Sequence, residues 1–195
     1  MKKYLPILIF FLGLKISPAT AQSDLSPRLL YIGLGASYPK GFVATGGSYN
    51  KNGWGGTLSI NPMWSSASNV PADYHDGGFT LINNLNDFTL LAAIRVLKEW
   101  STKSKPLKFG IEAGPVLVHT SIPDNFQYVS GWHLFSSNYT FDKVKENSVG
   151  FSLRGKFELS FSDWGGLELG CNANSSKGKS YFGVDLILTF GAYQE

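Results

Sequence analysis

The segment from Asn147 to Phe161 alternates apolar and polar residues at nearly every second position. Period-two alternation is typical of a β-strand whose two faces meet different surroundings. Strands of soluble proteins average about five or six residues, whereas a tilted strand that crosses a membrane needs ~9–11. A run of this length therefore favours a β architecture, and among β architectures one that spans a bilayer.

Seven further segments carry the same pattern less clearly. Together with the first, they predict strands over residues 30–38, 42–49, 54–64, 88–97, 107–117, 147–161, 167–173 and 182–190. The segment Phe42 to Tyr49 is the weakest, and it is included because bacterial single-chain membrane barrels have even strand numbers. Leu91 and Leu97 interrupt the polar face of the fourth segment, so a helix over residues 90–100 stays open.

No apolar run after residue 21 is long enough for a transmembrane helix, which needs ~20 residues. A membrane protein without such a helix must be a closed barrel, since only closure satisfies every backbone group in lipid. We therefore predict an all-β fold, an antiparallel up-and-down transmembrane β-barrel of about eight strands. A soluble periplasmic β-sandwich is the alternative, because strand alternation and buried aromatic residues fit both architectures.

Residues 1–21 predict a cleaved signal peptide. Lys2 and Lys3 precede an uncharged apolar run, and Ala19-Thr20-Ala21 supplies a small-residue cleavage pattern. Cleavage leaves residues 22–195 as one barrel domain and removes three of the 17 basic residues, so that 14 bases face 14 acids. This balance gives no electrostatic case for nucleic acid as a partner. The single cysteine, Cys171, excludes an internal disulfide and falls on the apolar face of its segment.

Loop lengths and aromatic residues give the barrel an orientation. With both termini in the periplasm, the inner turns are short and the outer connections 65–87 and 120–146 are long, as in outer-membrane barrels. Aromatic residues then fall into two bands, as expected where lipid tails meet headgroups. The inner band is Trp54, Trp100, Phe161, Trp164 and Phe190, and the outer band is Tyr38, Trp64, Phe88, Phe151 and Phe182. The pattern predicts an outer-membrane location with the lipid bilayer as the main partner.

Ionisable residues on the opposite strand face predict the content of the interior. They are Arg95, Glu112, Arg154, Lys156, Glu158, Glu168 and Asp185. An eight-stranded barrel is only wide enough for side chains to fill it, and buried charges are tolerated when most of them are paired. We therefore predict an internal charge network that plugs the barrel rather than an open pore.

Three segments resemble small porin-like outer-membrane β-barrel proteins of the Bacteroidota type. They are residues 54–59 (WGGTLS), 70–74 (VPADY) and 180–186 (SYFGVDL). The resemblance covers most of residues 22–195 as a pattern of strands, and it implies an outer-membrane location with about eight strands. That family has no common activity, so the resemblance implies no catalytic residue.

The sequence predicts no metal, cofactor or catalytic site. His75 lies near Asp73 and Asp76, but the calcium-loop pattern is missing and a solvated turn is favoured. His119-Thr120-Ser121 is similar to the His-x-Ser-Asn motif of lipid A deacylases, which leaves an outer-leaflet acyl hydrolase as an alternative. Ile122 takes the place of the motif's Asn, and no partner acid is identifiable. We predict a monomer without enzymatic activity, structural or porin-like in role.

The outer connection 120–146 is rich in aromatic residues. Phe126, Tyr128, Trp132 and Phe135 are candidates for binding an extracellular protein or small molecule. The same residues also suit a hairpin that extends the rim of the sheet, because aromatic pairs stabilise neighbouring strands. We favour this second interpretation, or a loop that folds over the barrel mouth.

Overall fold

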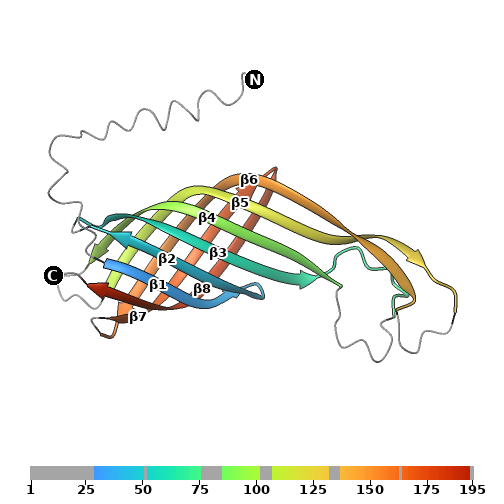
Figure 1. The fold of residues 1–195 in the computed structure, drawn as a ribbon, viewed down its shortest axis with the longest axis horizontal. Coiled ribbons are helices and arrows are strands. Elements are labelled where there is room, and N and C mark those ends of the chain that lie inside the picture. The colour runs from blue at the N-terminus through green and yellow to red at the C-terminus, as the bar shows by residue number, and fades with distance from the viewer. Residues whose placement is uncertain are drawn as a thin grey trace, which may run out of the picture.

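Eight antiparallel strands close into a barrel in the computed structural model of the chain (Figure 1). The structure describes residues 29–50, 52–75, 85–101, 107–131, 137–162 and 164–193, so the predicted signal peptide lies outside the described residues. The strands are β1 (Leu29–Tyr38), β2 (Gly41–Tyr49), β3 (Trp54–Ser66), β4 (Asn86–Ser101), β5 (Leu107–Tyr128), β6 (Tyr139–Ser160), β7 (Gly165–Ser176) and β8 (Lys179–Tyr193). Each strand pairs with its neighbours in the chain, and β1 pairs with β8 to close the ring. The predicted up-and-down barrel is confirmed, and the two-sheet sandwich is excluded.

The two doubtful segments of the sequence are both regular strands. β2 pairs with β1 along its whole length, so the weak strand predicted from Phe42 to Tyr49 is confirmed. β4 is one continuous strand, so the helical alternative for residues 90–100 is wrong. Leu91 and Leu97 interrupt its polar face because the barrel interior is not uniformly polar. Both side chains point inward, with 3% and 0% of their surface exposed.

The barrel wall is inverted relative to a protein folded in water. Outward-facing side chains are apolar and exposed, as in Leu30, Ile94 and Leu117, whereas ionisable side chains are buried inside. Successive side chains of a strand point to opposite faces, so an unbroken register keeps these two populations apart around the ring. No helix among the described residues has the length and apolar character needed to cross a membrane.

β5 and β6 are longer than the rest of the wall, with 22 residues each. Their pairing runs from Leu107 and Leu159 to Tyr128 and Tyr139, with a bulge between Asp124 and Gln127. The pairing of β6 with β7 stops at Phe151, so the upper part of the β5–β6 hairpin projects beyond the barrel (Figure 1). Most of the predicted 120–146 connection is therefore strand, which agrees with the rim-extension interpretation.

Candidate functional site

A cluster of nine ionisable side chains fills the barrel interior and is called the interior network below. Its members are Arg95, Glu99, Lys108, Glu112, Arg154, Lys156, Glu158, Glu168 and Asp185. All occupy inward positions of β4 to β8, and none has more than 6% of its surface exposed. Groups this deeply buried need partners, because desolvating a charge costs several kcal/mol, on the order of the whole net stability of a small domain.

Arg154 of β6 is the centre of the interior network. Its guanidinium contacts three carboxylates from three other strands: Glu112 at 3.2 Å, Glu168 at 2.5 Å and Asp185 at 3.3 Å. A planar guanidinium has five N–H donors in a fixed fork, so it can serve several carboxylates at once. Arg154 therefore connects β5, β6, β7 and β8 through charge-assisted contacts across the lumen.

Arg95 of β4 extends the network toward β3. Its Nη1 lies 3.4 Å from a Glu112 carboxylate oxygen and donates to the Ser59 hydroxyl at 2.8 Å. Its Nε donates to the Ser152 hydroxyl at 2.7 Å. The Thr57 hydroxyl donates to the same Glu112 oxygen at 3.0 Å. Neutral hydroxyls thus complete the hydrogen bonding of charges that cannot reach water.

Two lysines hold the acids nearest the end of the barrel where β1 begins and β8 ends. Lys156 Nζ is 3.0 Å from Glu99 and 3.4 Å from Glu168, and it also lies over the Tyr31 ring, 4.9 Å from the centroid. Lys108 Nζ donates to Glu158 at 2.8 Å. Every carboxylate of the interior network therefore has a cation within 4 Å, although its five acids outnumber its four bases.

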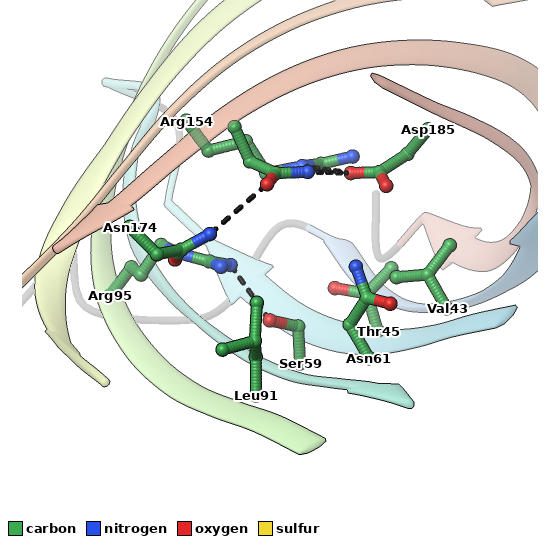
Figure 2. Close-up of a pocket in the computed structure, with 10 residues that line it drawn as sticks. Val43, Thr45, Ser59, Asn61, Leu91, Arg95, Arg154, Asn174 and Asp185 are labelled. Carbon is green, nitrogen blue, oxygen red and sulfur yellow. Dashed lines mark hydrogen bonds and ion pairs between the residues drawn. The ribbon is translucent and has the colours of Figure 1, made fainter. Parts of the chain in front are cut away.

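An apolar layer covers the interior network toward the end of the barrel from which the β5–β6 hairpin projects. It consists of Met63, Leu91, Ala93, Val116 and Val118, with Tyr181 packed against it. Below it, a small cavity with room for about 10 Å³ lies between Arg154 and Asp185 on one side and Thr45 and Asn61 on the other (Figure 2). That space is roughly one water molecule.

All seven residues named from the sequence for the interior lie inside the barrel. Reasoning from the sequence missed Lys108 and Glu99 as partners in the interior network. The sequence does contain this information. Lys108 lies four residues from Glu112, and Glu99 lies four residues from Arg95, so each pair points to the same face of its strand. Glu99 was overlooked because it lies beyond the end assigned to its strand, which continues to Ser101.

The outward aromatic residues lie at the two ends of the wall. At the end where β1 begins and β8 ends, the Trp164 ring stacks on Phe190 with centroids 6.1 Å apart and meets Phe161 edge-on at 6.5 Å. At the other end, the rings of Trp64 and Phe88 lie 5.7 Å apart. The most exposed members are Tyr38 at 75% and Phe182 at 72%. The residues named from the sequence for the two bands therefore share the outer surface and separate by strand end.

The projecting hairpin carries an aromatic cluster made of Tyr74, Phe126, Tyr128, Tyr139 and Phe141, called the hairpin cluster below. Neighbouring rings have centroids 5.5–6.4 Å apart. Trp132 and Phe135, the other two binding candidates, lie outside the described residues. Tyr74 comes from the connection between β3 and β4, so the hairpin cluster joins two segments that are distant in the sequence.

Polar contacts fix the β3–β4 connection onto the hairpin beside these rings. The Tyr139 hydroxyl donates to the Asp73 carboxylate at 2.9 Å, and this hydrogen bond raises the pKa of Tyr139 above its ordinary value. The Asn138 side chain accepts from the His75 N–H at 2.8 Å and donates to the Asp73 carbonyl at 2.8 Å. Asp73 and His75 thus make structural contacts, and Asp76 lies outside the described residues. No group of three acidic, His or Cys side chains in the described part of the chain could hold a metal.

His119 points outward from the wall, next to Phe88 of the outer aromatic band. Its Nδ1 is 2.7 Å from the Asn147 amide oxygen, and its ring meets Phe88 edge-on with centroids 6.4 Å apart. A histidine that activates a serine is normally oriented by an acid. Here the partner of the ring is a neutral amide from β6.

The chain is similar to known proteins in its fold and not in its sequence. No model of a protein family matches the chain, and no curated protein matches it by sequence. The N-terminal β-barrel domain of Pseudomonas aeruginosa OprF superimposes with a TM-score of 0.55 at 11% identity, covering 85% of this chain and 98% of that domain. The chain has the fold of such small barrels.

Two structures of one further protein are similar to the chain. Ail, the attachment invasion locus protein of Yersinia pestis, superimposes with a TM-score of 0.54 at 5% identity, covering 85% of this chain and 99% of Ail. The backbone structure of the outer membrane protein Ail in a phospholipid bilayer nanodisc gives a TM-score of 0.47 at 10% identity, covering 84% and 98%. At these identities the likeness concerns the fold alone, so residue roles are argued from this chain's own geometry.

Proposed function

We propose that this protein is an integral outer-membrane β-barrel without enzymatic activity, structural or porin-like in type. The observation that carries the proposal is the inverted wall, in which an exposed apolar surface surrounds a charged interior. Lipid is the solvent that suits such a surface, and a closed ring leaves no strand edge unpaired inside the bilayer. The shared fold with Ail, an outer membrane protein, supports the same location.

Cell fractionation tests this proposal. The mature protein should sediment with the outer membrane and resist extraction by alkaline carbonate, because its apolar wall has no stable surroundings in water. Recovery in the soluble periplasmic fraction, with monodisperse behaviour in detergent-free buffer, would contradict it.

The interior supports a barrel that conducts few or no ions. The interior network and the apolar layer fill the lumen, and an eight-stranded ring has no spare width. In planar bilayers, purified protein should give no stepwise conductance under conditions where a 16-stranded porin conducts. Regular, voltage-stable steps from the purified barrel would show that the lumen is open and refute this part of the proposal.

The hairpin cluster supports a role in binding an extracellular protein or small molecule. Tyr128 is 62% exposed, and its aromatic neighbours come from two connected segments beyond the barrel rim. Amphipathic aromatic residues of this kind dominate many recognition surfaces. Replacing both Phe126 and Tyr128 with Ser should abolish binding of an outer ligand and leave insertion into membranes unchanged.

Within the described residues, no contact of His119 supports the acyl hydrolase alternative. The His119 ring pairs with Asn147 and packs on Phe88, and the neutral amide cannot stabilise an imidazolium as a carboxylate does. His119→Ala should leave the acylation state of lipid A unchanged when the protein is expressed in cells. A change in lipid A acylation that depends on His119 would restore the enzyme hypothesis.

A further inference from the structure

Lys98 interrupts the apolar outer surface of the wall. On β4 it points outward in line with Ile94, Val96 and Trp100, which are all exposed and apolar. Among the strand positions that the structure describes from one aromatic band to the other, the levels of both bands included, it is the one Lys, Arg, Asp or Glu that points outward. A charge on the lipid face is strongly unfavourable at mid-depth and nearly tolerated at the interface. The cost of the Lys98 charge therefore depends on how far Lys98 lies from the middle of the membrane.

The level of Lys98 is that of the inner aromatic band. In the strand register it lies opposite Trp54 of β3 and Ile111 of β5. Its ammonium lies 5.1 Å from the centroid of the Trp54 ring and 5.7 Å from that of Trp100. Both distances are within the range in which an aromatic face attracts a cation. The two tryptophans therefore flank the charge and hold it at the membrane boundary.

The turn between β2 and β3 fixes this arrangement. Lys98 Nζ donates to the Asn52 carbonyl at 2.5 Å. The Asn50 side chain accepts from the backbone N–H groups of Asn52 and Trp54 at 3.0 and 3.1 Å. Gly53 adopts a φ of +74°, and a Cβ there would lie 2.1 Å from the Glu99 carbonyl oxygen. The turn is thus tied closely to β4, which sets the Asn52 carbonyl and the Trp54 ring relative to the ammonium.

The ammonium has capacity for a further acceptor. Of its three N–H groups, one is used by Asn52 within the described part of the chain. The acceptor that membranes present at this depth is the phosphate of a lipid headgroup, and a charge-assisted contact to phosphate is stronger than one to water. Val96 and Ile111, both exposed next to Lys98, offer apolar surface to the acyl chains of the same lipid.

We propose that Lys98, Trp54 and Trp100 form a binding site for the phosphate of one glycerophospholipid in the periplasmic leaflet. The proposal rests on the outer-membrane function proposed above, because that orientation places the inner band at the periplasmic headgroups. The three residues act as a clamp: the lysine binds the phosphate, and the tryptophans flank the headgroup and restrain the lysine.

Native mass spectrometry of the mature protein in non-ionic detergent tests the site. The protein is incubated with an equimolar mixture of dioleoylphosphatidylglycerol and dioleoylglycerol, which share acyl chains but differ in the phosphate. The wild-type protein should retain one phosphatidylglycerol with about fivefold preference, the effect expected of one basic residue near an anionic headgroup. Lys98→Gln should remove the preference, Lys98→Arg should keep it, and Lys177→Gln in the exposed β7–β8 turn should not alter it.

Equal retention of the two lipids by the wild-type protein, or an unchanged preference in Lys98→Gln, would overturn the proposal. Folding of each variant is checked by its heat-dependent mobility on a gel, and Lys98→Met replaces Lys98→Gln if the latter does not fold. Failure of the wild-type protein to fold in detergent would instead count against the proposed outer-membrane function. The two failures are therefore distinguishable.

Discussion

At the scale of single residues, the interior depends on one arginine and on the small residues that make room for it. Arg154 serves three carboxylates, and Gly170 of β7 lies directly beside its guanidinium. Removing one partner of a buried pair leaves the other charge uncompensated, which costs more than the pair contributes. Substitutions of inward-facing residues should therefore lower the stability of the barrel strongly, whereas substitutions of exposed residues should change it little.

Arg154→Gln should destabilise the barrel by about 3–5 kcal/mol, since the buried carboxylates of Glu112, Glu168 and Asp185 would lose their shared cation. Reversible urea unfolding in lipid vesicles measures this difference. Lys177→Gln is the control, because its contact with Glu146 is exposed to water and should contribute little. Similar stabilities of the two variants would mean that the interior network is not a structural element.

Gly170→Ala should destabilise the barrel by about 1–3 kcal/mol through overpacking. The added Cβ would lie 2.4 Å from Arg154 Nη2, so the guanidinium would have to shift away from its carboxylates. The matched control is Gly155→Ala, on the neighbouring strand, where a Cβ would meet no atom within 4 Å. Vesicle unfolding compares the two variants, and an effect of equal size at both positions would contradict the packing argument.

At the scale of elements, the β5–β6 hairpin is the feature that the sequence described least well. Its lower half shows clean alternation, but above residue 120 Pro123 and the charged run from Asp142 to Glu146 hide the pattern. The upper half is stabilised by cross-strand aromatic pairs and by the docked β3–β4 connection. Neither interaction is visible in local periodicity, because both join residues that are distant in the sequence.

Tyr139→Phe should release the β3–β4 connection and leave the barrel intact, because it removes the hydroxyl that donates to Asp73 and keeps the ring. Hydrogen exchange of residues 71–75 should become faster in this variant, while Tyr128→Phe, the control, should leave it unchanged. The Tyr139 pKa is raised in the folded protein, so the contact should persist below the ordinary tyrosine pKa and be lost as pH rises through the raised value. If residues 71–75 exchange at the same rate in Tyr139→Phe and in the wild-type protein, the contact between Tyr139 and Asp73 does not hold the β3–β4 connection.

At the scale of the whole molecule, the sequence was sufficient for the architecture. Alternation predicted seven of the strands in their correct order, because each strand separates an apolar face from a polar one and carries that separation in its own residues, and the even strand number of membrane barrels supplied the eighth, from Phe42 to Tyr49. Strand ends and partners inside the lumen were harder to predict. The pairing of Arg154 with Glu112, Glu168 and Asp185 depends on the register and shear of the closed ring, which no single segment encodes.

The most direct test of the account uses the lone cysteine, because Cys171 lies halfway along β7 with its side chain outward. A bimane fluorophore attached to Cys171 in the folded, vesicle-inserted protein should be quenched by phospholipids brominated at mid-chain and protected from iodide in the water. That result places the apolar wall in lipid. Quenching by iodide, with no effect of brominated lipid, would show that the wall faces water and would contradict the membrane barrel.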